Sequence, residues 1–166
     1  MTVVASRPDP VAFAPFGTFI DVPARVGERR SYSNWLTPVV GLTPQVHTNR
    51  VPPSALPLSI ARVERHPHAA QVFVPLQVTR YVVTVLPSDA QGRPDPAGAR
   101  AFVLPGTLGI AYRAGVWHSG ITALDGESSF VVLMWRGAED DDVFAGIAPL
   151  VVVPAVAGAA AGAGRG

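Results

Sequence analysis

Short runs of β-branched and aromatic residues alternate along the chain with turn-forming segments that are rich in proline and glycine. The clearest of these runs cover residues 71–74, 80–86, 100–104, 129–135 and 150–153. Runs of this length, bounded by proline and glycine, are typical of β-strands and leave little room for long helices. The pattern predicts an all-β barrel, with a short helical turn at residues 9–16 as a peripheral element.

The pattern also predicts one domain. Residues 1–154 hold all the predicted strands, whereas the Ala/Gly-rich residues 155–166 cannot bury enough apolar area to order themselves, so we expect a disordered tail there. Residues 27–53 show neither clean alternation nor helical periodicity, and irregular strands or a lid both fit them. A chain of 166 residues buries about two-thirds of its unfolded surface, which is enough for one core.

The charge is nearly balanced, with 13 basic and 12 acidic residues. The basic residues are spread along the chain instead of forming the cluster that neutralises phosphates, so we expect no nucleic-acid partner. Every basic residue is an arginine, which removes Schiff-base lysine chemistry and leaves planar guanidinium groups suited to carboxylates. A small substrate that carries a carboxylate fits this composition.

The chain contains no cysteine, which excludes disulfides, thiolate nucleophiles and cysteine-ligated zinc. The opening MTVVASRPDP breaks its apolar stretch too early for a signal-peptide core, so we expect a cytoplasmic protein. The apolar run at 147–164 has the length of a membrane span, but it is rich in glycine and alanine and contains two prolines. We therefore expect no membrane association.

Two separated motifs carry the candidate chemistry. The stretch ARVERHPHAAQVFVPL contains Glu64, His66 and Gln71, and the later stretch YRAGVWH ends in His118. A strand at residues 59–66 would place Glu64 and His66 on one face, because side chains alternate along a strand. If both stretches belong to one barrel, acid, imidazole and amide groups converge on one small pocket.

These motifs resemble those of cupin barrels, which commonly hold a metal on a His-x-His-(x)3-4-Glu motif and a later histidine. Glu64, His66, Gln71 and His118 occupy the corresponding positions here. The resemblance implies a single cupin-like jelly-roll barrel. An amide oxygen is a poor ligand for zinc-like ions, so we expect acid and base chemistry with no certain cofactor. If a divalent metal such as nickel is bound, Glu64, His66 and His118 are its expected ligands.

A longer resemblance joins the two motifs. FAPFGTFID at 13–21, ALPLSIARVERHP at 55–67, RAF at 100–102 and VWH at 116–118 occur in an order similar to that of the ureidoglycolate lyase family, formerly called ureidoglycolate hydrolases. The string ERHP-x-x-x-Q-x-F-x-P is its most specific part. The resemblance implies a homodimeric enzyme that splits ureidoglycolate into glyoxylate and urea late in purine degradation, in the breakdown of allantoin.

Breakdown of ureidoglycolate needs a base for the C2 hydroxyl proton, an acid for the departing urea nitrogen and a cation for the carboxylate. We expect Glu64 or His118 to act as the base, and His66 or His118 as the acid. The expected substrate-binding residues are Gln71, Tyr112, Arg113 and Trp117, with Arg113 on the carboxylate.

Two other functions stay open. A non-catalytic cupin would bind a small metabolite such as glyoxylate, and Ser119-Gly120, where the family favours His-Pro, slightly favours this function. A metal-dependent cupin enzyme would require His66, His68 and His118 to converge.

Overall fold

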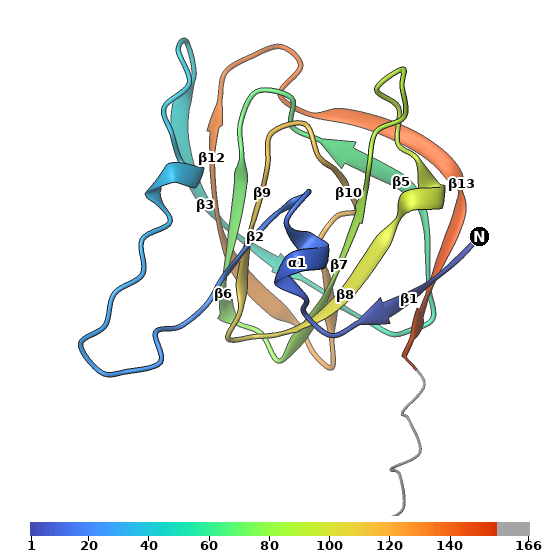
Figure 1. Cartoon of the computed structure of the whole chain (residues 1–166), viewed down its shortest axis with the longest axis horizontal. Coiled ribbons are helices and arrows are strands. Elements are labelled where there is room, and N and C mark those ends of the chain that lie inside the picture. Colours follow the sequence, from blue (N-terminus) through green and yellow to red (C-terminus); the bar gives the residue numbers. More distant parts are fainter. Residues whose placement is uncertain (156–166) are drawn as a thin grey trace, which may run out of the picture.

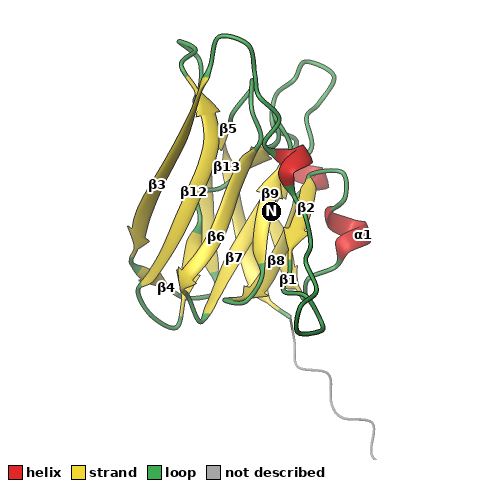
Figure 2. Ribbon diagram, turned by 90° about the vertical axis from the view of Figure 1, so that its left-hand side faces the viewer, coloured by secondary structure: helices red, strands yellow, loops and turns green. Residues whose placement is uncertain are grey.

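The structure, a computed structural model, describes residues 1–155 as two layers of β-sheet with short helical turns at the periphery (Figures 1 and 2). This architecture confirms the predicted all-β, cupin-like barrel. None of its helices, within the described residues, has the length and apolar character needed to cross a membrane.

In the described part of the chain, the larger sheet contains eight strands and closes on itself. In spatial order these are β10 (Trp117–His118), β5 (Leu58–Arg65), β13 (Val143–Pro154), β1 (Thr2–Ser6), β8 (Arg100–Pro105), β7 (Arg80–Leu86), β11 (Thr122–Leu124) and β4 (Pro53–Ser54). The short strand β10 pairs with β7 as well as with β5, so the strands from β10 round to β7 form a closed ring.

The smaller sheet contains five strands and packs against one side of this ring (Figure 2). In spatial order these are β2 (Gly17–Ile20), β9 (Gly109–Tyr112), β6 (Gln71–Gln77), β12 (Ser128–Arg136) and β3 (Thr43–Val51). The strand β3 is one edge of this sheet and is mostly exposed to solvent.

Two apolar cores follow from this arrangement, and β7 contributes to both. Val83 and Val85 belong to the core between the two sheets, whereas Val82 and Leu86 belong to the core inside the ring. Since both faces of the strand are buried, its sequence from Tyr81 to Leu86 is apolar except for Thr84 and shows no polar alternation. The core between the sheets is rich in aromatic rings, such as the stacked pair of Phe13 and Phe19.

Within residues 1–155, three short helical turns lie outside the sheets: α1 (Pro10–Phe13), η1 (Ser33–Trp35) and η2 (Pro96–Gly98). Asp9 caps α1, because its Oδ1 accepts from the backbone N–H groups of Val11 and Ala12. The predicted helical turn at 9–16 is therefore confirmed, and it buries Phe13 in the core.

The strands predicted in the middle of the chain are confirmed as β6, β7, β8 and β12. The predicted last strand was too short, because β13 begins at Val143 and an irregularity between Gly146 and Leu150 breaks its apolar pattern. The prediction of irregular strands or a lid at 27–53 was wrong for β3, which pairs in register with all of β12. Residues 156–166, most of the predicted tail, lie outside the described residues.

Candidate active site

The motif residues meet where strands of the two layers end. Glu64 lies near the end of β5 and is paired with His118 of β10. Gln71 begins β6 and is paired with Tyr112, the last residue of β9. His66 follows directly after β5, which ends one residue earlier than predicted. The ring supplies the carboxyl and imidazole groups, and the smaller sheet supplies the amide and the phenol.

Glu64, His66 and His118 form a compact cluster. One carboxylate oxygen and one nitrogen from each imidazole lie within 4.8 Å of one another. The two imidazoles are almost fully buried, with exposed fractions of 6% and 2%, whereas the Glu64 side chain keeps 25%. The carboxyl group is therefore the member of the cluster that solvent and substrate reach first.

Hydrogen bonds on Nδ1 fix both imidazoles in the same tautomer. The Nδ1 of His66 lies 3.0 Å from the carbonyl oxygen of Asp141 and 2.9 Å from Oδ1 of Asp142. The Nδ1 of His118 lies 3.0 Å from the carbonyl oxygen of Val116. A carbonyl oxygen only accepts, so Nδ1 carries the hydrogen in both rings. Both Nε2 atoms are buried without a hydrogen-bond partner among the described residues, and each keeps a lone pair for a proton or a metal ion.

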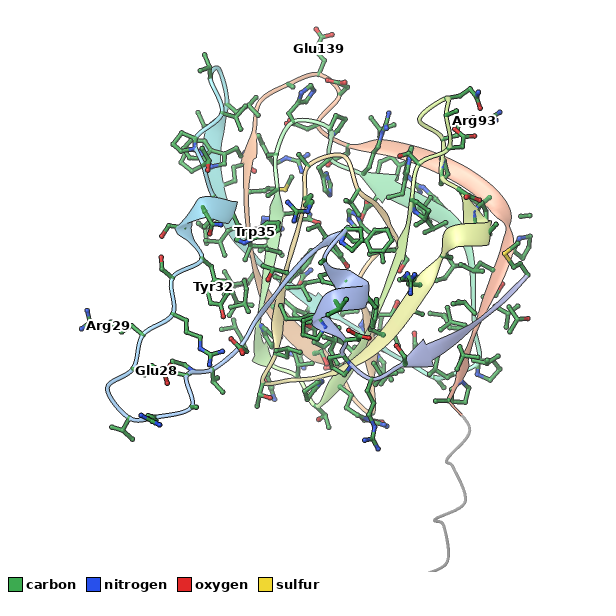
Figure 3. The ribbon with its side chains drawn as sticks, in the orientation of Figure 1. Glu28, Arg29, Tyr32, Trp35, Arg93 and Glu139 are labelled. Atoms are coloured by element: carbon green, nitrogen blue, oxygen red, sulfur yellow. The ribbon has the colours of Figure 1, made fainter. Side chains whose placement is uncertain are left out.

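Asp142 connects His66 to Arg136. Its carboxylate accepts two hydrogen bonds from the Arg136 guanidinium, one of them at 2.9 Å. Arg136 holds the pKa of Asp142 below its usual range, so this carboxylate is ionised and can balance a proton taken up by Nε2 of His66. The connecting loop 137–142 stands at this end of the barrel, with Glu139 at its outer tip (Figure 3).

Burial sets the protonation states of the cluster. Burial lowers the pKa of His118 to about 3, although its hydrogen bond to the Val116 carbonyl opposes this shift. Burial raises the pKa of Glu64, and the charge of His66 opposes that rise. The contact of 3.7 Å between Nε2 of His118 and Oε1 of Glu64 is therefore not an ion pair at neutral pH, because His118 is neutral there. The site holds a carboxyl group with raised proton affinity beside a neutral imidazole.

Gln71 and Tyr112 lie at the same end of the barrel. The Tyr112 ring stacks on the His118 ring, with 4.2 Å between centroids and 20° between planes. Burial raises the pKa of Tyr112 well above its ordinary value, so its hydroxyl stays protonated. The Oε1 of Gln71 is buried without a hydrogen-bond partner among the described residues and is free to accept one.

The structure does not bring Arg113 into the cluster. This arginine follows the end of β9 and is exposed. Its Nε and Nη2 donate to the carbonyl oxygen of Ala14 at 3.3 and 3.2 Å, and its guanidinium lies 4.9 Å from the ring centroid of Trp35. It holds the segment before β2 to the barrel.

Trp117 also lies away from the cluster, since it is next to His118 on a strand and must face the opposite side. Its indole belongs to the core inside the ring and donates to the Gly92 carbonyl oxygen at 3.1 Å. His68 is exposed and pairs with Asp140 at 2.7 Å. The described residues therefore do not form the set of His66, His68 and His118.

Three residues near the cluster were not among the expected site residues: Arg62, Asp142 and Phe144. The acidic run before β13 was a signal for Asp142, but a sequence alone does not tell which of its acids reaches His66.

A pocket of about 210 Å³ opens beside Glu64 and is lined by Arg62, Val63, Glu64, Gly120 and Phe144. At ~30 Å³ per water molecule, it has room for a small metabolite.

The cluster fits a divalent metal ion in its donor set. Two neutral imidazole nitrogens and one carboxylate form the facial set found at several non-haem metal sites. The Nδ1–H of each histidine is bonded to a carbonyl or carboxylate oxygen, as is usual for histidines that bind metals through Nε2. The orphaned Nε2 atoms support this fit.

A larger cavity of about 660 Å³ lies at the other end of the ring, where Arg80 begins β7 and Leu124 ends β11. It does not include any residue of the cluster. Of the cluster residues, Glu64 lines the smaller pocket of about 210 Å³.

A closed all-β barrel with two imidazoles and a carboxyl group between its sheets defines the class of cupin-like proteins. Within this class the chain belongs to the ureidoglycolate lyase family, whose profile, described as ureidoglycolate lyase, matches residues 1–149. This match confirms the family resemblance inferred from the motifs.

Three relatives illustrate the family match. The ureidoglycolate lyase of Burkholderia cepacia is 39% identical over 132 residues, covering 74% of this chain and 73% of the relative. That of Burkholderia mallei (strain NCTC 10229) is 37% identical over 131 residues, with coverages of 74% and 75%. That of Brucella ovis is 33% identical over 141 residues, with coverages of 78% and 80%.

Among solved structures, a dTDP sugar isomerase from Desulfovibrio desulfuricans G20 aligns with 78% of this chain and 82% of its own. The sequence identity is 16% and the TM-score is 0.47.

Proposed function

We propose that this protein is a lyase that splits ureidoglycolate into glyoxylate and urea by general acid and base catalysis. Membership of the ureidoglycolate lyase family supports the substrate, and the buried cluster supports the chemistry. The observation that carries the proposal is the pair of free Nε2 lone pairs beside a carboxyl group whose pKa is raised.

The reaction requires two proton transfers around one bond. A base takes the proton of the C2 hydroxyl, the C2–N bond breaks as the aldehyde of glyoxylate forms, and an acid protonates the departing urea nitrogen. We assign the base to Glu64, because its raised pKa matches it better to a proton from a hydroxyl group than an ordinary carboxylate. We assign the acid to His66, because the ionised carboxylate of Asp142 lies 2.9 Å from its Nδ1 and its Nε2 faces the cluster.

His118 has a different part in this proposal. Because its pKa is about 3, it is neutral and accepts a hydrogen bond instead of donating a proton. Its Nε2 lies next to Glu64. In this position Nε2 can accept a hydrogen bond from the hydroxyl group of the substrate or from the carboxyl group of protonated Glu64. Tyr112 supports the ring by stacking, and Gln71 offers Oε1 to an N–H of the ureido group.

A second candidate role for the same atoms is to hold a divalent metal such as nickel, and the orphaned Nε2 atoms favour it. Glu64, His66 and His118 would be the ligands. When bound, the metal would supply Lewis-acid polarisation of a substrate oxygen. Elemental analysis of the purified protein, before and after dialysis against a chelator, with activity measured in both states, decides between the two roles.

The test of the proposed function is urea release from racemic ureidoglycolate. We expect the purified protein to release urea and glyoxylate in equal amounts from ureidoglycolate. If the protein uses one enantiomer, consumption of the racemic substrate is expected to stop at one half. Binding of glyoxylate without turnover of ureidoglycolate would instead support the non-catalytic cupin.

The setting of the activity is part of the same proposal. We propose that the protein acts in purine degradation, on the ureidoglycolate that allantoin breakdown yields, in the cytoplasm and as a homodimer. The homodimer is supported by the exposed edge strand β3, which offers unpaired backbone groups to a second copy.

A further inference from the structure

The proposed reaction needs a cation beside the cluster, because the substrate carries a carboxylate next to the bond that breaks. The chain has arginine but no lysine, so the permanently charged side chain available for this position is a guanidinium group. Several arginines lie near the end of the barrel that holds the cluster. They differ in the ion pairs and hydrogen bonds that their guanidinium groups already form.

Three of these arginines are engaged elsewhere. Arg136 is bound to the carboxylates of loop 137–142. Arg113 donates to a backbone carbonyl of the N-terminal segment. Arg65 stacks on an indole at 4.7 Å and donates to a backbone carbonyl at 3.1 Å, on the face of β5 opposite to Glu64.

Arg62 is arranged differently. It lies two residues before Glu64, on the same face of β5, and it lines the pocket of about 210 Å³ that contains Glu64. It forms no ion pair within the part of the chain that the structure describes. Its guanidinium lies 3.9 Å from the ring centroid of Phe144, which is paired with Glu64 across the strands and lines the same pocket.

The contact with Phe144 prepares Arg62 for a planar anion. A guanidinium that lies over an aromatic ring is held by its face, so the N–H groups in its plane stay available. Two parallel N–H groups match the two oxygens of a carboxylate. Because the ring restricts the long side chain before the ligand arrives, less conformational freedom is lost on binding.

We propose that Arg62, supported by Phe144, binds the carboxylate of the substrate and makes the site selective for small carboxylic acids. This inference rests on the proposed lyase function for the identity of the substrate. The position of Arg62 places the carboxylate at the outer side of the pocket and leaves the C2 hydroxyl for Glu64.

The test compares Arg62→Gln and Arg62→Lys with the wild type. Calorimetric titration with sodium glyoxylate is expected to show affinity weakened by roughly 10- to 100-fold in Arg62→Gln, the cost of losing hydrogen bonds to a charged group. Arg62→Lys keeps the positive charge but loses the two parallel N–H groups of the guanidinium. Its affinity for glyoxylate is expected to lie between those of the wild type and Arg62→Gln. In turnover of ureidoglycolate, KM is expected to rise by a similar factor while kcat changes little.

Controls separate a local effect from a general loss of charge or fold. Arg29→Gln removes one positive charge from the outer loop (Figure 3), far from the pocket, and is expected to bind glyoxylate like the wild type. Thermal unfolding followed by circular dichroism checks that every variant folds. The neutral probe glycolamide is expected to bind wild type and Arg62→Gln equally weakly.

The outcomes distinguish this inference from the proposed function. Cleavage of ureidoglycolate with equal KM and equal glyoxylate affinity in wild type and Arg62→Gln overturns the role of Arg62 and leaves the lyase. Wild-type protein that releases no urea, but loses glyoxylate affinity on Arg62→Gln, overturns the lyase and supports the anion site. Wild-type protein that binds glyoxylate no better than glycolamide overturns the role of Arg62.

Discussion

Two buried imidazoles face the same carboxyl group, and each is fixed by a hydrogen bond on its far nitrogen. For His66 the acceptors come from the loop 137–142, and for His118 the acceptor is the Val116 carbonyl of its own turn. These contacts keep the hydrogen of each ring on Nδ1, so Nε2 carries a free lone pair. Both Nε2 atoms are without a hydrogen-bond partner among the described residues. A buried nitrogen without a hydrogen bond is unfavourable for folding, and a bound substrate or metal ion would satisfy it.

Glu64→Gln tests the cluster at the scale of one side chain. The amide keeps the shape of the carboxyl group but cannot take a proton, so kcat/KM for ureidoglycolate is expected to fall by about 10²–10⁴-fold. The melting temperature is expected to stay close to that of the wild type, because Glu64 is partly exposed and forms no ion pair with the neutral His118. Steady-state urea release and circular dichroism measure both effects.

Glu139→Gln is the matched control, since Glu139 lies at the exposed tip of a loop (Figure 3). It is expected to behave like the wild type. His118→Ala is expected to lower turnover as well. If Glu64→Gln and His118→Ala both turn over at the wild-type rate, the acid and base mechanism is wrong.

Single residues also show what the sequence could and could not predict. Glu64, His66 and His118 were found because they are chemically distinctive and lie in recognisable motifs. Trp117 was expected at the site, but alternation along β10 turns it and His118 to opposite faces. Arg113 was expected there because it is the arginine nearest in sequence to the second motif, but the turn after β9 directs it to the N-terminal segment.

At the scale of elements, the loop 137–142 is as important to the site as the strands. It carries Asp142, which holds His66 on one side and Arg136 on the other. The acidic run has no periodic pattern, so its sequence predicts a loop but not a contact. Its position is fixed by the pairing of β13 with β5, which brings Val143 beside Arg65.

Asp142→Asn tests this loop. The amide cannot balance the charge of a protonated His66, so kcat/KM is expected to fall by about 10- to 100-fold, as is usual when a partner of a functional histidine is lost. Nitrogen NMR of the histidine side chains is the second measurement. Because the Asp141 carbonyl still accepts from Nδ1, the tautomer of His66 is expected to persist while the rate falls.

Asp140→Asn is the control for Asp142→Asn. It changes a neighbouring acid of the same loop, which contacts the exposed His68 and not the cluster. A rate reduction of equal size in both variants would mean that the loop acts through its overall charge and not through Asp142.

The pairing of β2 with β9 depends on Gly17. A Cβ at this position would lie 2.0 Å from the backbone carbonyl oxygen of Ala111, and backbone atoms cannot move aside cheaply. Gly17→Ala is therefore expected to lower the free energy of unfolding by about 1–3 kcal/mol. Urea denaturation measures the change. Gly126→Ala is the control, because a Cβ there meets nothing within 4 Å, and equal destabilisation of both variants would contradict the explanation.

Strands buried on one or both faces were predictable, and the exposed strand was not. The runs that became β7 and β12 are strongly apolar because they line a core. The strand β3 has nine residues, but most of them are exposed. Because neither face of β3 is buried, its sequence TPQVHTNRV does not alternate between apolar and polar residues. The strand β3 forms because it pairs with β12 in antiparallel register along its whole length. This pairing depends on a distant segment, so the sequence of β3 alone does not predict it.

At the scale of the whole molecule, the site exists only when the two layers pack. The ring supplies Glu64 and His118, while the smaller sheet supplies Gln71 and Tyr112, and the stacking of Tyr112 on His118 joins them. The motifs could be read separately in the sequence, but their convergence depends on contacts between residues about fifty positions apart, such as Glu64 and His118.

The outer edge of the smaller sheet bears on how whole molecules associate. Edge strands expose unpaired backbone N–H and C=O groups, and pairing across a two-fold axis is one way to satisfy them. The edge strand β3 carries Val46, whose exposed fraction of 67% is large for a valine. We expect the wild type to be a dimer through this edge. A lysine at the edge opposes such pairing.

Val46→Lys is therefore expected to shift the protein from dimer to monomer over a range of concentrations. Light scattering after size-exclusion chromatography measures the mass directly. Val40→Lys is the matched control, because Val40 is fully exposed but lies outside β3. A monomeric wild type, or a Val46→Lys variant that stays as dimeric as Val40→Lys, would show that β3 is not the interface. Since the Glu64 cluster belongs to one chain, turnover per chain is expected to be similar in dimer and monomer.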